Sequence, residues 1–314
     1  MRLKEYLNPI LFIKGVAMGV ANIIPGVSGG TIALITGIYE KLIFSIKKFD
    51  SKAFKLLMQF KFKEFAEYIH LQFLFPVIIG IIFAGLSLAK IFDYLFENYP
   101  VFLWAYFFGL VLASVYYVGK MVESWKKTTY ILFLTGAIVA VSITIIDPLK
   151  ENRDPVYIFF NGVISIVGMV LPGLSGSFLL ILLGNYQIIL IDAINNFDLK
   201  ILLPFALGSI VGLLAFSHVL SWLLKNYRNE TIALLTGFVL GSLGILWPWK
   251  EPVYLVNNGE IVVKHGKKLV AYYEHILPRQ IDSTFFLTLF FMFLGIISII
   301  FIEIMYLKEK KNKK

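Results

Sequence analysis

Hydrophobic residues dominate long stretches of this chain, and charged residues gather in the short segments between them. Six stretches approach or exceed the ~18–20 apolar residues that a helix needs to cross a bilayer. They cover residues 71–92, 101–118, 129–146, 201–224, 231–249 and 283–307. The pattern predicts a transmembrane helix in each stretch, and therefore an integral membrane protein of the all-α class.

Two further apolar stretches are broken near their middle by proline and glycine. The breaks read "IIPGVSGGT" at residues 23–31 and "VLPGLSGSF" at residues 170–178. Non-helical backbone at bilayer depth is tolerated only where protein surrounds it or where it lines a wet cavity. We therefore expect re-entrant helical hairpins over 9–46 and 155–191, each of which enters the membrane and returns to the side from which it came.

The length of the returning arm favours this hairpin over a pair of full crossings. Tyr39 follows Ser28 by 11 residues. That is about 16 Å of helix, or roughly half of a ~30 Å hydrocarbon core. The breaks would then lie near the midplane, with Tyr39 and Tyr186 at the level of the lipid headgroups, where tyrosine is favoured.

Self-comparison indicates that the chain contains two copies of one unit. A shift of 147 residues places Pro25, Gly26, Ser28 and Gly29 on Pro172, Gly173, Ser175 and Gly176, and a shift of 128 places Pro76, Gly80 and Tyr99 on Pro204, Gly208 and Tyr227. We predict two repeats, 1–147 and 154–307, each with one re-entrant hairpin and three transmembrane helices. Because three crossings is an odd number, the repeats are expected to be inverted relative to one another.

Two segments lie outside this common plan. The first repeat holds an extra stretch, 46–70, whose apolar residues recur every three or four positions with six lysines between them. It suits an amphipathic helix on an anionic leaflet, or alternatively a solvated linker helix. The second repeat holds the loop 250–282, where "YLVNNGEIVV" predicts a small extracytoplasmic β-hairpin with an Asn-Gly turn.

The charged residues are better explained by membrane orientation than by a nucleic-acid partner. The net charge is +9, but only 16% of the residues are charged, against about 25% in soluble domains. Of the 29 Lys and Arg, 18 lie in segments that face inward when the N-terminus is cytoplasmic, and 8 lie in the outer segments. Cytoplasmic loops are enriched in Lys and Arg, so both termini are expected in the cytoplasm. Cysteine is absent, which excludes disulfides and Cys-based metal sites.

The paired breaks predict an anion-binding site. Ser28 and Ser175 are natural N-caps for the returning arms, whose first N–H groups are unpaired and carry about half a positive charge. Hydroxyl groups and exposed glycine backbone at these ends suit a phosphate or a carboxylate. The candidate substrate-binding residues are Asn22, Gly26, Ser28, Gly29, Gly30, Thr31, Gly173, Ser175, Gly176 and Ser177. The alternative is a packing device, in which glycine permits close helix approach and proline adds a kink.

Few charged residues lie inside the apolar stretches, where each costs at least ~2.5–3.5 kcal/mol. Lys14, Glu40 and His218 are the candidates for a proton- or ion-coupling group or a charge partner of the substrate. A lone histidine in a crossing is nevertheless more often a packed helix residue. The remaining charged residues suit snorkelling to the interface: Lys41, Lys90, Asp93 and Glu303. No catalytic residue, metal site or cofactor is predicted.

The two motifs resemble those of the PopT polyprenyl-phosphate transporters. "ANIIPGVSGGTIALITGIYEKLI" and "LPGLSGSFLLILLGNY" carry the resemblance, which extends over essentially the whole chain. It implies a flippase in the bacterial cytoplasmic membrane that returns undecaprenyl phosphate, or a related carrier lipid, from the outer to the inner leaflet. The lipid would then be reused in the synthesis of peptidoglycan and other envelope polymers. One departure is Gln187, which stands where the resemblance leads us to expect an acidic residue like Glu40.

Two other functions fit parts of the pattern. "PGVSGG" also resembles the Pro-Gly-x-Ser-Arg-Ser motif of undecaprenyl-pyrophosphate phosphatases, but Gly29 and Gly176 stand at the arginine position, and the paired glutamates of those enzymes are not found near either motif. Phosphoanhydride cleavage would then lack its charge stabiliser and its metal or base. The other alternative is a transporter of small anions, which a lipid-facing side opening would argue against.

Overall fold

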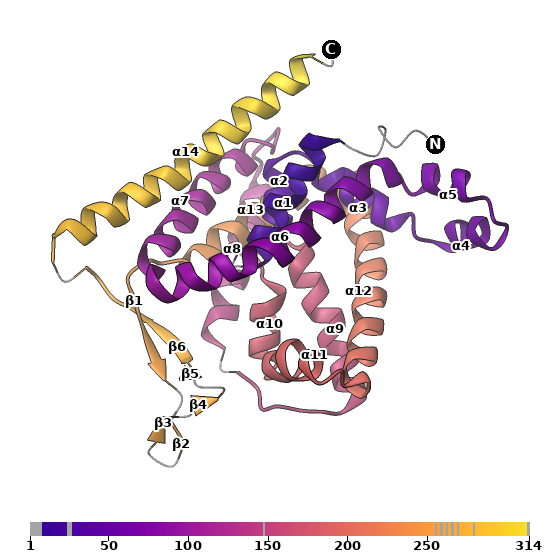
Figure 1. The fold of residues 1–314 in the computed structure, drawn as a ribbon. Coiled ribbons are helices and arrows are strands. Elements are labelled where there is room, and N and C mark those ends of the chain that lie inside the picture. The colour runs from indigo at the N-terminus through magenta and orange to yellow at the C-terminus, as the bar shows by residue number, and fades with distance from the viewer. Residues whose placement is uncertain are drawn as a thin grey trace.

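The computed structural model describes residues 8–23, 27–146, 148–254, 256–257, 260–261, 263–264, 267–268, 270–278 and 280–312. Among these residues, five helices are long and apolar enough to cross a membrane. They are α6 (Leu71–Asn98), α7 (Pro100–Gly119), α8 (Lys127–Ile145), α12 (Leu199–Asn226) and α14 (Ser283–Asn312). The chain is therefore a mostly helical, multi-pass membrane protein (Figure 1).

The crossing predicted over 231–249 is shorter than expected. Its helix, α13 (Arg228–Gly241), has 14 residues and ends in a 3-10 turn, η3 (Ser242–Gly244). Glycines at the end of α13 and in η3 weaken the helix, and Pro248 cannot continue it because it lacks an N–H and its ring blocks the preceding turn. At about 21 Å, α13 alone is too short for a ~30 Å hydrocarbon core.

Both broken stretches fold into short helices. The first gives α1 (Pro9–Ile23), α2 (Gly29–Ile35) and α3 (Tyr39–Lys47), with a bend of 118° between α2 and α3. The second gives α9 (Pro155–Val170), α10 (Gly176–Leu182), the π-helix η2 (Ile188–Asp192) and α11 (Ala193–Asn195).

The same turn ends α2 and α10. Gly37 and Gly184, 147 positions apart, have φ values of +71° and +75°, a left-handed conformation that glycine adopts without strain. After Gly37, the N–H of Ile38 donates to the carbonyl of Ala33 at 2.9 Å, and after Gly184 the N–H of Asn185 donates to Leu180 at 3.0 Å. These bonds satisfy helix-end carbonyls and let each chain reverse direction.

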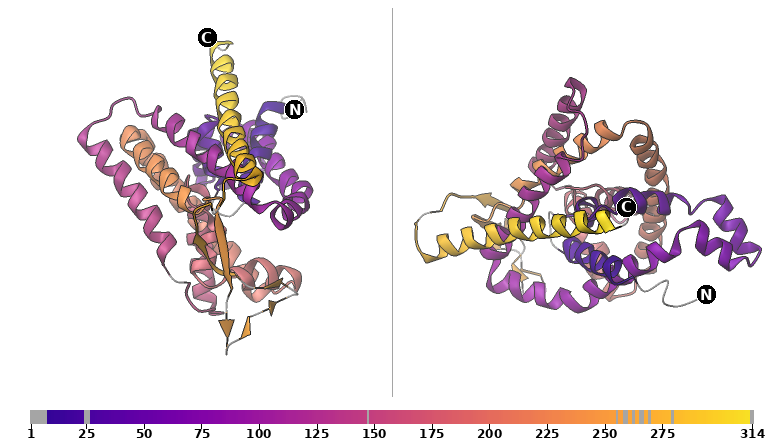
Figure 2. Two further views of the ribbon diagram at one scale, coloured as in Figure 1. Left: turned by 90° about the vertical axis from the view of Figure 1, so that its left-hand side faces the viewer. Right: turned by 90° about the horizontal axis from the view of Figure 1, so that it is seen from above.

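The long helices pair within and between the two halves of the chain. α1 packs along α6, and α9 packs along α12. Across the halves, α7 packs along α14 and α8 along α13, and the latter pair lies side by side in Figure 2. Gly109 on α7 faces the backbone of Met292, as Gly237 on α13 faces Phe133. Glycine allows the backbones to approach closely at these crossings.

The joints between the long helices are also alike. Tyr99 separates α6 from α7 with φ −135° and ψ 44°, and Tyr227 separates α12 from α13 with φ −136° and ψ 52°. Pro76 and Pro204 lie inside the preceding helices. Two positions 128 residues apart thus have the same backbone conformation.

The extra stretch 46–70 is two short helices rather than one. α4 (Ser51–Met58) ends in a left-handed residue, Phe60, after which Lys61 donates to the carbonyl of Leu56 at 3.0 Å, and α5 (Phe62–Tyr68) follows. The helices project to one side of the body in Figure 1, and each buries a single alanine. Large apolar side chains are exposed on them: Phe54, Met58, Phe60 and Phe62.

The loop 250–282 contains the predicted β-structure. β1 (Lys250–Tyr254) pairs antiparallel with β6 (Val270–His275). Between them lie two smaller antiparallel pairs, β2 (Val256–Asn257) with β3 (Glu260–Ile261) and β4 (Val263–Lys264) with β5 (Lys267–Lys268). The Asn-Gly turn itself lies outside the described residues.

Candidate functional site

The two broken motifs meet in the folded chain. The Ser28 hydroxyl donates to the carbonyl of Met169 at 3.0 Å, and the N–H of Gly173 donates to the hydroxyl of Thr31 at 3.0 Å. Tyr39 donates to the neighbouring carbonyl of Val170 at 3.2 Å. Residues more than 130 positions apart in the sequence therefore form one buried contact at the end of α9.

Ser28 is the N-cap of α2, as predicted, but this helix end is already satisfied by the protein. The N–H of Gly30 donates to the Ser28 hydroxyl at 3.0 Å, and the N–H of Gly29 donates to Oδ1 of Asn22 at 2.8 Å. The next N–H, of Thr31, donates to the Ser28 carbonyl at 2.9 Å. The first N–H groups of α2 therefore all have partners within the first hairpin and are not available to a ligand.

The end of α10 is more open. The Ser175 hydroxyl caps the helix through a long 3.5 Å bond from Phe178, and it lies 2.8 Å from the hydroxyl of Ser177. In the described structure, the N–H groups of Gly176 and Ser177 donate no hydrogen bond. Unpaired donors at a helix start are available to a ligand or to water.

A cavity of about 290 Å³ lies beside this open helix end. Its walls come from α9, α10, η2 and α12, and the tip of the first hairpin closes one side. None of its described lining residues is charged, and six are polar: Asn22, Ser28, Ser165, Ser175, Ser177 and Ser209. We call this space the serine-lined cavity. It brings together five of the predicted residues: Asn22, Ser28, Ser175, Gly176 and Ser177.

Ser165 and Ser209 line the cavity but were not predicted. The Ser165 hydroxyl donates to the carbonyl of Gly176 at 3.3 Å, and that of Ser209 to Phe205 at 2.9 Å. The positions that match them in the first repeat hold Met18 and Ile81. A polar residue in one repeat opposite an apolar residue in the other is the signal that could have found them.

Asn161 is a third unpredicted polar residue in this half. Its side chain is 1% exposed, and neither its amide nitrogen nor its oxygen has a hydrogen-bond partner in the described structure. It lies one helical turn before Ser165, so the two share a face of α9. A buried amide without partners costs about 1–3 kcal/mol. A water or a ligand that bonded to Asn161 would recover this energy.

The predicted glycines are required by packing. A side chain on Gly30 would collide with the carbonyl of Val170, and one on Gly176 with the carbonyl of Ser165. Gly29 faces the side chain of Asn22, and Gly173, whose φ is +81°, faces the backbone of Phe238. The Cα faces of these four glycines are thus occupied by protein rather than open to an anion. Gly26 lies outside the described residues.

The predicted coupling residues lie away from the cavity. The Lys14 ammonium donates to the carbonyl of Thr36 at 2.9 Å. Glu40 accepts from Arg228 at 2.9 Å, and Arg228 also lies 3.6 Å from Glu123. His218 is exposed on α12, with Nδ1 2.8 Å from the Leu214 carbonyl of its own helix.

Two other expectations are modified by the fold. Tyr39, which was expected at the level of the headgroups, is buried in the protein: it is 1% exposed, and its hydroxyl donates to the carbonyl of Val170 at the end of α9. Gln187, the counterpart of Glu40, donates to Asp192 at 3.3 Å within its own half. The ion pair that ties Glu40 to the other half therefore has no equivalent at Gln187.

Comparison with known proteins assigns the family. The family model described as undecaprenyl phosphate translocase-like matches residues 18–262. A polyprenyl-phosphate transporter of Vibrio cholerae is 39% identical over 294 residues, covering 93% of this chain and 95% of the relative. One of Staphylococcus aureus is 31% identical over 256 residues, covering 76% and 86%. No solved structure matches the chain. The chain belongs to the undecaprenyl phosphate translocase-like family.

Proposed function

We propose that this protein is a flippase that moves undecaprenyl phosphate, or a related polyprenyl phosphate, from the outer to the inner leaflet of the bacterial cytoplasmic membrane. The observation that carries the proposal is the serine-lined cavity, where six uncharged polar side chains gather between two interrupted helices inside a multi-pass membrane protein. The names of the relatives from Vibrio cholerae and Staphylococcus aureus support this cargo.

The cavity suits a headgroup that must be bound and then released. A phosphate cannot cross hydrocarbon bare, because an isolated buried ion costs tens of kcal/mol in the Born limit. Ser175 and Ser177 offer hydroxyls, and the open end of α10 offers N–H donors. Donors without a fixed cation bind the phosphate less tightly than an arginine fork would, which favours release on the far side.

The proposed architecture is two inverted repeats, 1–147 and 154–307, each with a re-entrant hairpin. The order of elements supports it: a broken hairpin, a long proline-containing helix, a tyrosine joint and two further helices occur twice. We place both termini and the α4–α5 pair on the cytoplasmic side and the β-structure outside. Exposure of the cavity first to one leaflet and then to the other would move the headgroup.

The enzyme alternative gains no support from the cavity. Gly29 and Gly176 occupy the positions where the related phosphatases carry arginine, and the described lining residues include no carboxylate. A phosphoanhydride cleavage needs both charge stabilisation and a base or metal. Transport needs neither.

The test is a leaflet-resolved flipping assay with purified protein in proteoliposomes. Wild-type protein should move undecaprenyl phosphate, and the double variant Ser28→Ala, Ser175→Ala should fold but lose this movement. Running the assay with and without a pH gradient tests proton coupling. No movement by the wild type refutes the transport function, and phosphate release from undecaprenyl pyrophosphate would support the enzyme instead.

A further inference from the structure

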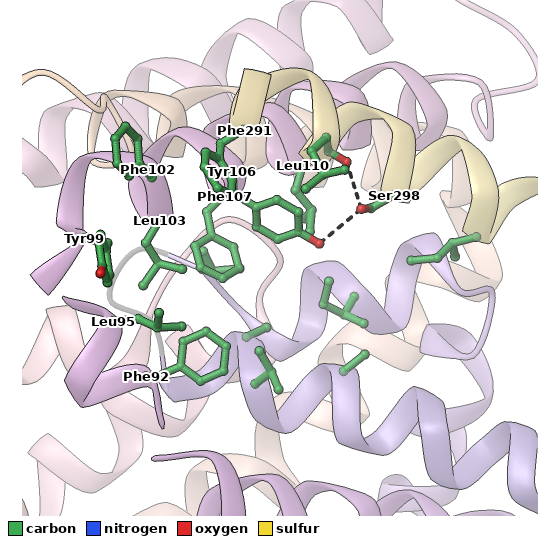
Figure 3. Close-up of a pocket in the computed structure, with 17 residues that line it drawn as sticks. Phe92, Leu95, Tyr99, Phe102, Leu103, Tyr106, Phe107, Leu110, Phe291 and Ser298 are labelled. Atoms are coloured by element: carbon green, nitrogen blue, oxygen red, sulfur yellow. Dashed lines mark hydrogen bonds between the residues drawn. The ribbon is translucent and has the colours of Figure 1, made fainter. Parts of the chain in front are cut away.

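A second and larger cavity lies on the side of the first repeat. Its volume is about 770 Å³, and it is enclosed by α1, α2, α6, α7 and α14. Figure 3 shows aromatic side chains around it, among them Phe92, Phe102, Phe107 and Phe291. The polar groups in its described lining are three hydroxyls, of which Tyr106 donates to Ser298 at 3.2 Å. We call this space the apolar groove.

We propose that the apolar groove binds the isoprene units next to the phosphate of the lipid whose headgroup occupies the serine-lined cavity. This inference rests on the proposed function, and it adds a binding site for the tail. Val27 lines both spaces, so one side chain stands between the place for the headgroup and the place for the chain attached to it.

The chemistry of the lining favours an isoprenoid occupant. Isoprene units are apolar, flat and methyl-branched, and they pack well against broad aromatic faces. The volume of about 770 Å³ falls within the ~300–1,000 Å³ of small-molecule sites. The groove is therefore too small for an entire undecaprenyl chain. The groove would therefore hold the start of the tail and leave the remainder in the bilayer.

The groove also has an opening through which a tail could leave. Tyr99 and Leu294, on its lining, are 50% and 39% exposed, whereas Val27 at its inner end is buried. Both exposed residues lie next to membrane-spanning helices, α6 and α7 for Tyr99 and α14 for Leu294. In the proposed orientation the Tyr99 joint is at the outer face of the membrane, so the opening faces the leaflet from which the lipid is collected.

The direct test is photo-cross-linking in proteoliposomes with full-length protein. The probe is undecaprenyl phosphate with a diazirine on the isoprene unit next to the phosphate. We expect label on the groove-lining residues of α1, α7 and α14, and we expect excess undecaprenyl phosphate, but not inorganic phosphate, to suppress it. Label confined to the exposed face of α8, around Leu134, would overturn the inference.

A pair of matched variants gives a second readout. Ala17 lines the groove on α1, and its counterpart 147 residues later, Ile164, is exposed on α9. Ala17→Phe should fill the groove, remove the cross-link to α7 and slow transport about tenfold or more, as small misfits in apolar pockets do. Ile164→Phe should change transport by less than about twofold, since surface substitutions have small effects.

The outcomes separate the tail site from the function itself. If wild-type protein moves undecaprenyl phosphate but is labelled outside the groove, the tail site is wrong and the transport function stands. If wild-type protein moves no polyprenyl phosphate, the proposed function fails. If Ala17→Phe does not fold, the cross-links on the wild-type protein still decide between a tail in the groove and a tail in the lipid.

Discussion

The interiors of the two hairpins differ sharply although their helices follow the same order. The serine-lined cavity lies between the second hairpin and α12, and Ser165, Ser177 and Ser209 are among its six polar lining residues. In the first hairpin the matching positions hold Met18, Gly30 and Ile81. Met18 and Gly30 are buried, and Ile81 packs against the hydrophobic core.

The second space, the apolar groove, occurs in the first half and is filled in the second. The first half holds the apolar groove, lined in part by Phe92 and Phe107. Their counterparts 128 residues later, Leu220 and Leu235, are buried in the core. Between these two leucines in the sequence, Arg228 pairs with Glu40 and joins the halves. The two halves therefore share an order of elements, but each half holds a different space.

The strongest test of this comparison introduces valine at two matching positions of the hairpins, Ser177 and Gly30. Ser177→Val should fold but lower transport about tenfold or more, because a hydrogen bond to a charged group is worth ~1.5–3 kcal/mol. Gly30→Val should destabilise the protein by at least about 1–3 kcal/mol through overpacking against Val170. Flipping assays and thermal unfolding in detergent measure the two effects. Equal behaviour of the two variants would contradict the assignment of the cavity to the second hairpin.

Single alanine variants of the two capping serines should separate binding from folding. Ser28→Ala removes a helix cap and the bond to Met169, so it should lower stability by about 1 kcal/mol. Ser175→Ala loses the long bond from Phe178 and the hydroxyl contact with Ser177, and neither joins the two halves, so it should reduce transport more than stability. The same unfolding and flipping measurements apply, with Ser114→Ala, a serine bonded to its own helix at 2.6 Å, as the control. A larger transport loss in Ser28→Ala than in Ser175→Ala would reverse our assignment.

Asn161→Leu should stabilise the protein while slowing transport. Removing an amide with no partner recovers up to about 1–3 kcal/mol, whereas a water or ligand that uses the amide loses its contact. Thermal unfolding measures the first effect and the flipping assay the second. Asn185→Leu is the contrasting variant: Asn185 bonds to Asn152 through both side-chain atoms, so its loss should destabilise. Unchanged transport in Asn161→Leu would show that the amide has no role in it.

The smallest effect is expected at the ion pair between the halves. Glu40 and Arg228 are each about one-third exposed at their side chains, so Glu40→Gln should cost less than about 1 kcal/mol of stability. It should nevertheless loosen the packing around Leu220 and Leu235, which are buried in the second half. Because the chain has no cysteine, Leu235→Cys reports this directly: maleimide labelling should rise in the Glu40→Gln background. The conservative variant Glu40→Asp should keep labelling low, and identical labelling in all three backgrounds would argue against a closing role.

Local signals in the sequence were sufficient for the elements that depend on local chemistry. The Pro-Gly breaks, the serine caps and five of the crossings follow from residue type and hydrophobic run length. The split between α4 and α5 was missed because the left-handed residue there is Phe60, where no glycine or proline marks a turn. The short α13 was missed because hydropathy alone ignores the glycines that end it.

The candidate site depended on information that no local pattern contains. Ser165 and Ser209 are single serines in apolar helices, and only the packing of α9 against α12 determines that they line a cavity. The pairing of Glu40 with Arg228 joins residues 188 positions apart. The glycines were predicted to admit a ligand, but in the fold they contact the backbone of other segments, as Gly30 contacts Val170 and Gly173 contacts Phe238. The sequence alone does not show which segments meet.

The exchanged helix pairs restrict how this molecule can change shape. Helix α7 packs on α14, and α8 packs on α13, so these four helices join the two halves. They cannot separate without exposing their crossings, and we regard them as the fixed part of the molecule. In the proposed transport cycle, the parts that move would be the two hairpins with α6 and α12, and the matching joints at Tyr99 and Tyr227 would be the pivots. Under the proposed alternating exposure of the serine-lined cavity, rotation about two joints of the same backbone conformation would cost little backbone energy. A few side chains at the helix crossings would then decide which leaflet the cavity faces at rest.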